Sequence, residues 1–299
     1  KNMINIKDHG FDYVKETKLF WKEGAKYKEL DAALNASIEK AYKDIMVRTL
    51  TVKEDNKSID IIKTLKESVF KSNIKTYFNE GDFPESCKIF DDFHKKLCQS
   101  AIECLGKKYN DIKYGKAQKL VNMTFKYLYC TKYVEENNKK DLFKCCHIAL
   151  DSIILEWLYK YVYDEYEIDN NQQLCKSNSN KPKLTRDNTP SWSNLTYSIN
   201  EKLIEDGKYT YNFYNQIIKQ YFKDTIAPDN NITPFEAEFI IWREMQMELA
   251  SEAFYSNLQK YRYGSDTKIK ELPCNTSVTD KLNIIKNNPF NIIIGYNLL

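Results

Sequence analysis

The chain has 299 residues, of which 42% are hydrophobic, 14% aromatic and 29% charged, a composition typical of folded proteins that excludes wholesale disorder. Its 45 basic and 42 acidic residues leave a net charge of +3, so a basic surface able to bind nucleic acid would have to be local. No apolar run approaches the roughly 18 residues that a membrane span needs, and residues 1–10 are polar, with no visible secretory signal. We therefore expect a cytoplasmic protein without a membrane partner.

The sequence offers little support for a metal or a cofactor. Neither of the common glycine-rich phosphate-binding motifs, G-x-x-x-x-G-K and G-x-G-x-x-G, occurs. The three histidines, His9, His94 and His147, lack the spacing of metal ligands and are expected to be buried or capping residues. The cysteines form no C-x-x-C pair, and we favour reduced thiols over disulfides; they stand at positions 87, 98, 104, 130, 145, 146, 175 and 274.

Hydrophobic periodicity along the chain favours helices. The expected helices cover residues 28–48, 59–70, 87–106 and 116–129, then a helix opened by Asp151, then 198–205, 210–223 and 233–261. The last of these begins with the sequence Thr-Pro-Phe-Glu, a capping box in which two side chains satisfy backbone N–H groups at the helix start. Residues 111–115 are a connector in which Gly115 suits a turn before the next helix.

Two segments interrupt this pattern. Residues 167–190 are rich in turn-forming polar residues and form a linker or excursion. Residues 264–299 are an irregular tail, whose last nine residues could be a strand or a docked apolar end. The sequence predicts an all-α, monomeric protein with two packed helical lobes, divided into residues 1–86, 87–166, 167–190, 191–263 and 264–299.

A lysine-rich stretch lies between residues 105 and 126. Its lysines are Lys107, Lys108, Lys113, Lys116, Lys119 and Lys126, against the single acidic residue Asp111. Around two helices joined by a turn, such a stretch can bind DNA phosphates. The alternative is a solvated helix face with no ligand.

One lysine and one aspartate have the properties of a reaction centre. Lys119 borders the apolar stripe of its helix, with Lys116 one turn before it. Partial burial and a neighbouring cation both favour the neutral amine that a Schiff-base nucleophile needs. Asp151, at a helix N-terminus, would be held ionised by backbone N–H groups and the helix dipole. It is either a simple cap or a partner for positive charge that develops during a reaction.

Three segments carry a resemblance to a known family. They are 116-KAQKLVNMTFKYLYC-130, 148-IALDSIILEWL-158 and 234-PFEAEFIIW-242. Together they resemble the archaeal 8-oxoguanine DNA glycosylase branch of the helix–hairpin–helix glycosylases. Lys119 matches the lysine of that family and Asp151 its aspartate. Glu238 and Trp242 match a late acid and tryptophan that contribute to the base pocket.

The chain also departs from the family pattern. Leu150 replaces the proline expected before the aspartate, and Met123 stands where an aromatic stacking residue is usual. Glu238 replaces an aspartate. The resemblance implies a base pocket formed by Met123, Leu150, Glu238 and Trp242, but the departures leave the preferred base open.

The resemblance implies a two-lobed helical bundle of the helix–hairpin–helix glycosylase type. Residues 87–166 would carry the hairpin and the catalytic helices, and residues 191–263 would complete the base pocket. The implied partner is duplex DNA with the target base flipped out of the stack, its backbone held by Lys107, Lys108, Lys113 and Lys116.

The implied activity is that of a DNA glycosylase and AP lyase without a cofactor. Lys119 would form a Schiff base with the sugar, and Asp151 would stabilise the positive charge. The target would be a damaged or modified purine such as 8-oxoguanine. The alternative is a non-enzymatic all-α module that binds nucleic acid or a protein partner through the lysine-rich stretch.

Overall fold

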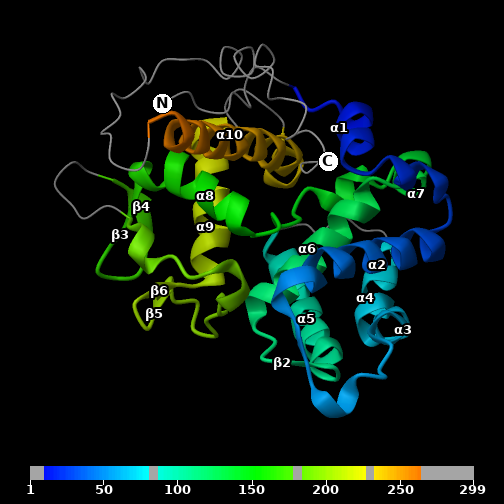
Figure 1. Ribbon diagram of the computed structural model, residues 1–299. Coiled ribbons are helices and arrows are strands. Elements are labelled where there is room, and N and C mark those ends of the chain that lie inside the picture. The colour runs from blue at the N-terminus through cyan, green and yellow to red at the C-terminus, as the bar shows by residue number, and fades with distance from the viewer. Residues whose placement is uncertain (1–9, 81–86, 178–183, 227–231, 264–299) are drawn as a thin grey trace. The chain divides into compact units, whose positions relative to one another are not determined.

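Figure 1 shows a computed structural model that describes residues 10–80, 87–177, 184–226 and 232–263. The chain divides into two compact units, residues 6–241 and residues 242–299 with 1–5. The described part is mostly helical with a few short strands, which confirms the all-α expectation. His9, Cys274 and the predicted tail 264–299, with its strand or docked end, lie outside the described residues, as do residues 178–183 of the excursion.

The elements follow the chain in this order. The helices are α1 Tyr13–Trp21, α2 Leu30–Thr49, α3 Ile61–Lys66, α4 Val69–Glu80, α5 Cys87–Gly106, α6 Tyr114–Tyr129, α7 Lys132–Glu136, α8 Ser152–Tyr161, α9 Tyr211–Tyr221 and α10 Pro234–Tyr263. The strands are β1 Thr51–Val52, β2 Tyr109–Asn110, β3 Tyr166–Ile168, β4 Leu174–Lys176, β5 Ile204–Glu205 and β6 Lys208–Tyr209. Three antiparallel pairs result, β1 with β2, β3 with β4 and β5 with β6. The predicted excursion therefore contains a β-ribbon.

Most predicted helices are confirmed, and two predictions need correction. Residues 198–205 form a turn and strand β5, because Glu201 takes a φ value of 56°, which a right-handed helix cannot accommodate. The helix expected over 59–70 ends at Lys66, and a second helix, α4, follows. Helix α4 has an apolar stripe of its own, in which Phe70 and Ile74 are fully buried.

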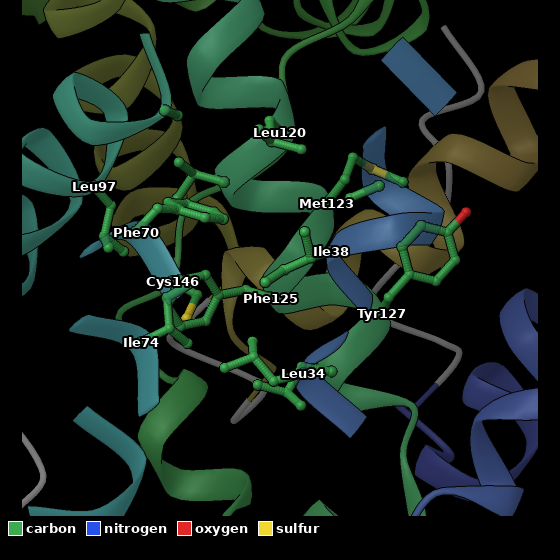
Figure 2. Packing of buried hydrophobic residues seen from close by; sticks show 14 of the residues in the cluster. Leu34, Ile38, Phe70, Ile74, Leu97, Leu120, Met123, Phe125, Tyr127 and Cys146 are labelled. Atoms are coloured by element: carbon green, nitrogen blue, oxygen red, sulfur yellow. The ribbon is translucent and has the colours of Figure 1, made fainter. Parts of the chain in front are cut away.

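The core of the unit 6–241 is built around α6, which packs against α2 and α5 (Figure 1). Figure 2 shows Leu34 and Ile38 of α2 beside Phe125 of α6, with Ile74 of α4 and Leu97 of α5 completing the cluster. Almost every residue of α6 is buried, so its polar side chains must find partners inside the protein.

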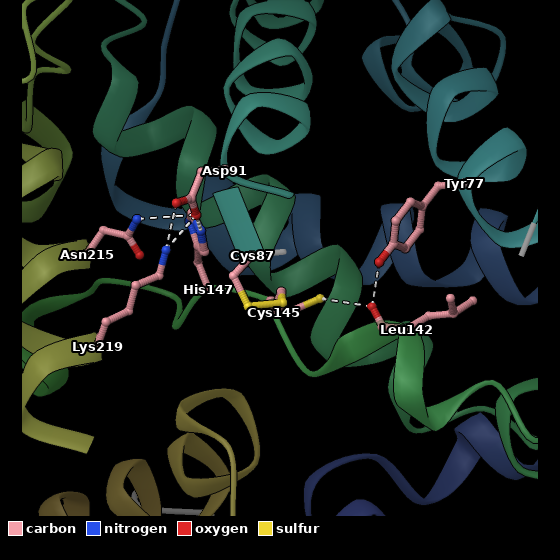
Figure 3. Close-up of a disulfide and its surroundings, with 9 residues drawn as sticks. Tyr77, Cys87, Asp91, Leu142, Cys145, His147, Asn215 and Lys219 are labelled. Carbon is pink, nitrogen blue, oxygen red and sulfur yellow. Dashed lines mark hydrogen bonds and ion pairs between the residues drawn. A yellow bond between two sulfur atoms is a disulfide. The ribbon is translucent and has the colours of Figure 1, made fainter. Parts of the chain in front are cut away.

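One disulfide corrects the expectation of reduced thiols. Cys87, the first residue of α5, is bonded to Cys145, 58 residues later (Figure 3). The fold brings the two together because the segment after Phe143 returns to the start of α5. Within the described ranges, no helix is long and apolar enough to cross a membrane.

Candidate active site

Lys119 of α6 and Asp151, the N-cap of α8, lie side by side. The Lys119 Nζ is 3.4 Å from the Asp151 Oδ2, and the two side chains are 14% and 12% exposed. The other carboxylate oxygen of Asp151 accepts hydrogen bonds from the backbone N–H groups of Ile153 and Ile154, at 3.0 and 3.1 Å. One oxygen therefore caps the helix and the second faces the ammonium, at a position that solvent still reaches.

Two buried amide side chains of α6 hold the segment that carries Asp151. Gln118 donates to the carbonyl of Leu150 at 2.8 Å and accepts from its N–H at 3.2 Å. One turn later, Asn122 donates to the carbonyl of Ile148 at 2.9 Å. Because Gln118 directly precedes Lys119, pairing Gln118 with Leu150 brings Asp151 to Lys119. Sequence reasoning missed both amides, although two of them four residues apart in a mostly apolar helix are a signal for such partners.

Trp192 completes the surroundings of the lysine. The Lys119 Nζ lies 4.6 Å from the centre of the indole ring, within the range of a cation–π interaction. Gly115 permits this approach, because a Cβ there would lie 1.9 Å from the Trp192 carbonyl oxygen. Gly115 lies inside the first turn of α6, so it serves as a contact point for another segment and not as a turn before the helix. No periodic pattern marks Trp192 in the sequence.

Lys116 has a different place from the one expected. Its ammonium donates to the carbonyl oxygen of Asp111 at 2.8 Å, and the residue is buried. The partner that the structure gives Lys119 is the carboxylate of Asp151. A lysine nucleophile at this position therefore has a proton acceptor beside it.

Glu238 has a structural partner in place of the expected role in base binding. Its Oε1 lies 2.8 Å from the Nζ of Lys126, and both side chains are 2% exposed. Its Oε2 accepts the N–H of Ala149 at 3.1 Å. Burial raises the pKa of Glu238, and the charge of Lys126 opposes that rise. Both oxygens are engaged within the core, so the expectation that Glu238 contacts a base is corrected.

Two other expected base contacts also lie in the core. Met123 is 9% exposed and belongs to the hydrophobic cluster around α2 and α6 (Figure 2). Leu150 is 1% exposed, and its backbone groups are bonded to Gln118. Met123 is packed among the apolar side chains of the cluster and Leu150 is almost without solvent exposure, so neither side chain is placed to stack on a base.

The lysine-rich stretch does not form a continuous basic surface. Lys116 is buried, which corrects its expected role as a phosphate contact, and Lys126 is buried in its ion pair with Glu238. The Nζ of Lys108 donates to the carbonyl of Ile59 at 2.6 Å. Lys107 is exposed, and Lys113 is partly exposed with its Nζ 3.8 Å from the carboxylate of Asp111, so solvent reaches both lysines.

Trp242 belongs to the second compact unit, and the structure leaves open its position relative to Lys119.

In the part of the chain that the structure describes, no group of three or more His, Cys, Asp or Glu side chains could hold a metal ion. Comparison with known proteins identified no matching family model, curated protein or solved structure.

Proposed function

We propose that this chain is a DNA glycosylase and AP lyase that excises a damaged or modified purine such as 8-oxoguanine. The observation that carries the proposal is the pairing of Lys119 with Asp151 at 3.4 Å, partly open to solvent. An amine needs a base to become a nucleophile, and a carboxylate beside it can take its proton and then stabilise a cation. The resemblance in the sequence assigns the same two residues.

The proposed reaction uses these two side chains. Lys119 transfers a proton to Asp151 and attacks C1′ of the sugar with its nitrogen lone pair. The glycosidic bond breaks, its electrons leave with the purine, and the purine takes up the proton that Asp151 received. Transfer of a proton from the alkylated amine through Asp151 to O4′ opens the sugar ring and gives a protonated imine between Lys119 and C1′. Loss of a C2′ proton with departure of the 3′ phosphate is the β-elimination that breaks the strand, and hydrolysis of the imine by water releases Lys119.

Trp192 supplies an aromatic surface at this centre. A base can be attacked only after it leaves the stack, and enzymes of this kind hold the flipped base between aromatic or apolar side chains. The ring of Trp192 lies beside the Lys119 ammonium, so we propose it as the stacking residue in place of Met123. We leave Trp242 as a second candidate, supported by the resemblance alone.

A polar groove supports an approach of the DNA backbone. A depression of about 470 Å³ is lined by Ser191 and Asn194 on either side of Trp192, and by Lys113 and Lys208. Hydroxyl, amide and ammonium donors of this kind bind phosphate oxygens. Glu205 and Asp206 also line the groove, and the carboxylate of Glu205 accepts a hydrogen bond from Ser198 at 2.6 Å. We propose duplex DNA as the partner of a monomer of the helix–hairpin–helix type.

A borohydride trap tests the proposal. The protein is incubated with duplexes that contain 8-oxoguanine or other modified purines, and reduction of an imine would leave a covalent adduct on a denaturing gel. Lys119→Gln should abolish the adduct. Asp151→Asn keeps a side chain suited to the N-cap but loses the charge, and should slow adduct formation by about 100-fold.

The control is the substitution Lys28→Gln. The side chain of Lys28 is 65% exposed, and its replacement should leave the adduct unchanged. An adduct that persists in Lys119→Gln, or no adduct with any substrate, would contradict the proposal. Binding of DNA without an adduct would favour the non-enzymatic module.

A further inference from the structure

A cavity of about 260 Å³ lies between the start of α5, residues 144–150 and α9. Cys87 and Cys145, whose disulfide is drawn in Figure 3, are among the residues that line it. Apolar side chains cover another part; they include Ile148, Leu150, Ile218 and Phe222. The volume is slightly below the range of about 300 to 1,000 Å³ that is usual for small-molecule sites, so a ligand would have a short apolar chain or a single ring.

The polar part of the wall comes from one face of α9 and its extension. Asn215, Lys219 and Lys223 follow one another at intervals of four residues and all line the cavity, as expected for one side of a helix. The lining contains no Asp or Glu side chain. The charged side chains of the lining are therefore three lysines, of which Lys144 pairs with Asp141 at 2.9 Å.

Asp91 of α5 positions one of these lysines. The Nζ of Lys219 is 2.7 Å from both carboxylate oxygens of Asp91 (Figure 3). The side-chain amide of Asn215 also donates to the Oδ1 of Asp91, at 3.5 Å. An ammonium has three N–H donors and an amide has two, so Lys219 and Asn215 each keep one donor for a ligand. Burial opposes ionisation of Asp91, but the hydrogen bond from His147 and the charge of Lys219 outweigh it and lower its pKa. The carboxylate stays ionised and holds the lysine at the cavity.

His147 lines the cavity as an uncharged side chain. Its Nε2 is 2.6 Å from Asp91 Oδ1, and its Nδ1 is 2.9 Å from the hydroxyl of Tyr211. Because a carboxylate can only accept, Nε2 carries the proton and Nδ1 accepts from Tyr211. Burial lowers the pKa of His147, with the charge of Lys219 adding to it and Asp91 opposing. The imidazole is thus neutral at pH 7, and the positive charge comes from the lysines.

We propose that this cavity binds a small organic anion, with its apolar part against Ile218 and Phe222 and its carboxylate or phosphate group on Asn215, Lys219 and Lys223. A cavity with an apolar wall and lysines at one side fits such a molecule better than a neutral or cationic one. The site does not involve Lys119, so it stands or falls independently of the proposed glycosylase.

An NMR titration of the full chain tests the proposal. The probes are hexanoate and hexyl phosphate, with 1-hexanol and hexylammonium as the uncharged and cationic analogues of the same length. In protein labelled at the isoleucine methyl groups, at least one of the two anions should shift the resonances of Ile148, Ile218 and Ile232, which line the cavity. The buried Ile61, which lies outside the lining, should not respond. The preferred anion identifies the head group.

Variants locate the binding. Lys223→Gln leaves the pair of Asp91 and Lys219 in place and should weaken anion binding by about tenfold, the loss of one charged hydrogen bond. Ile218→Phe should abolish binding by filling the space. Lys202→Gln, at an exposed lysine outside the cavity, is the matched control.

Two results would overturn the proposal. The first is binding of 1-hexanol or hexylammonium as tightly as the anions. The second is anion binding that both Lys223→Gln and Ile218→Phe leave unchanged, with unfolding midpoints showing that the two variants are folded. Absence of any shift at the cavity with both anions would contradict it equally.

Discussion

Removing the cross-link between Cys87 and Cys145 should lower the free energy of unfolding by about 4 kcal/mol. The disulfide joins residues 58 positions apart and so restricts a long loop of the unfolded chain. For a loop of this length, the chain-entropy relation gives about 14 cal/mol/K, or about 4 kcal/mol at 25 °C. This is a large share of the stability of an ordinary domain.

The assay is urea unfolding of the wild type, with and without a reducing agent, beside the double variant Cys87→Ala with Cys145→Ala. We expect reduction to lower the midpoint of the wild type by roughly 1 to 2 M urea. The double variant should unfold near the reduced wild type, and the reducing agent should not change its midpoint.

Two results would refute this reasoning. One is a wild-type midpoint that does not move although alkylation shows both thiols to be reduced. The other is a peptide map of the native, unreduced protein in which Cys87 and Cys145 are each alkylated as thiols.

Three further perturbations follow from the buried polar groups and the glycine contact. Glu238→Gln removes the carboxylate charge from beside the buried Lys126, and urea titration should show a loss of about 3 to 5 kcal/mol. Gly115→Ala places a methyl group 1.9 Å from a backbone oxygen and should cost about 1 to 3 kcal/mol, whereas Gly106→Ala meets no atom within 4 Å and should cost far less. Burial lowers the pKa of His147 below its ordinary value of 6.5; the unfolded chain therefore binds more protons as the pH falls below 6.5, and unfolding midpoints should drop between pH 7 and pH 5.

Each of these has a contradicting outcome. If the double variant Glu238→Gln with Lys126→Met is more stable than Glu238→Gln alone, the result agrees with the ion-pair argument. A free energy of unfolding that Glu238→Gln alone leaves almost unchanged would contradict it. Equal costs for the two glycine variants would show that the close contact is absent. A midpoint that is flat between pH 7 and pH 5 would show that the imidazole is accessible to protons in the folded chain.

The sequence predicts best where the signal is local. The stripe of residues 87–106 and the capping box before α10 depend on neighbours within a few positions, and the structure has both helices. The pairing of Lys119 with Asp151 could be anticipated because each residue lies at a recognisable point of a helix. Their contact also needs Gln118, which a reading of single helices passes over.

The sequence predicts poorly where distant segments meet. The partner of Glu238 is Lys126, on a helix more than a hundred residues earlier, and no local pattern distinguishes that pair from two surface charges. Trp192 reaches Lys119 because Gly115 lets another segment come close. The disulfide likewise depends on where residues 143–146 return in the fold. Each of these contacts is a property of the tertiary packing.

The short stretch from Ile148 to Asp151 has to keep its length. Its backbone is bonded to Gln118 and Asn122, while Ile148 and Leu150 line the cavity. A single inserted or deleted residue would move Asp151 away from Lys119 and, at the same time, withdraw an apolar side chain from the cavity wall. A single substitution in this stretch would change one of the two sites, but a change in the number of residues would disrupt both the Lys119–Asp151 pair and the cavity.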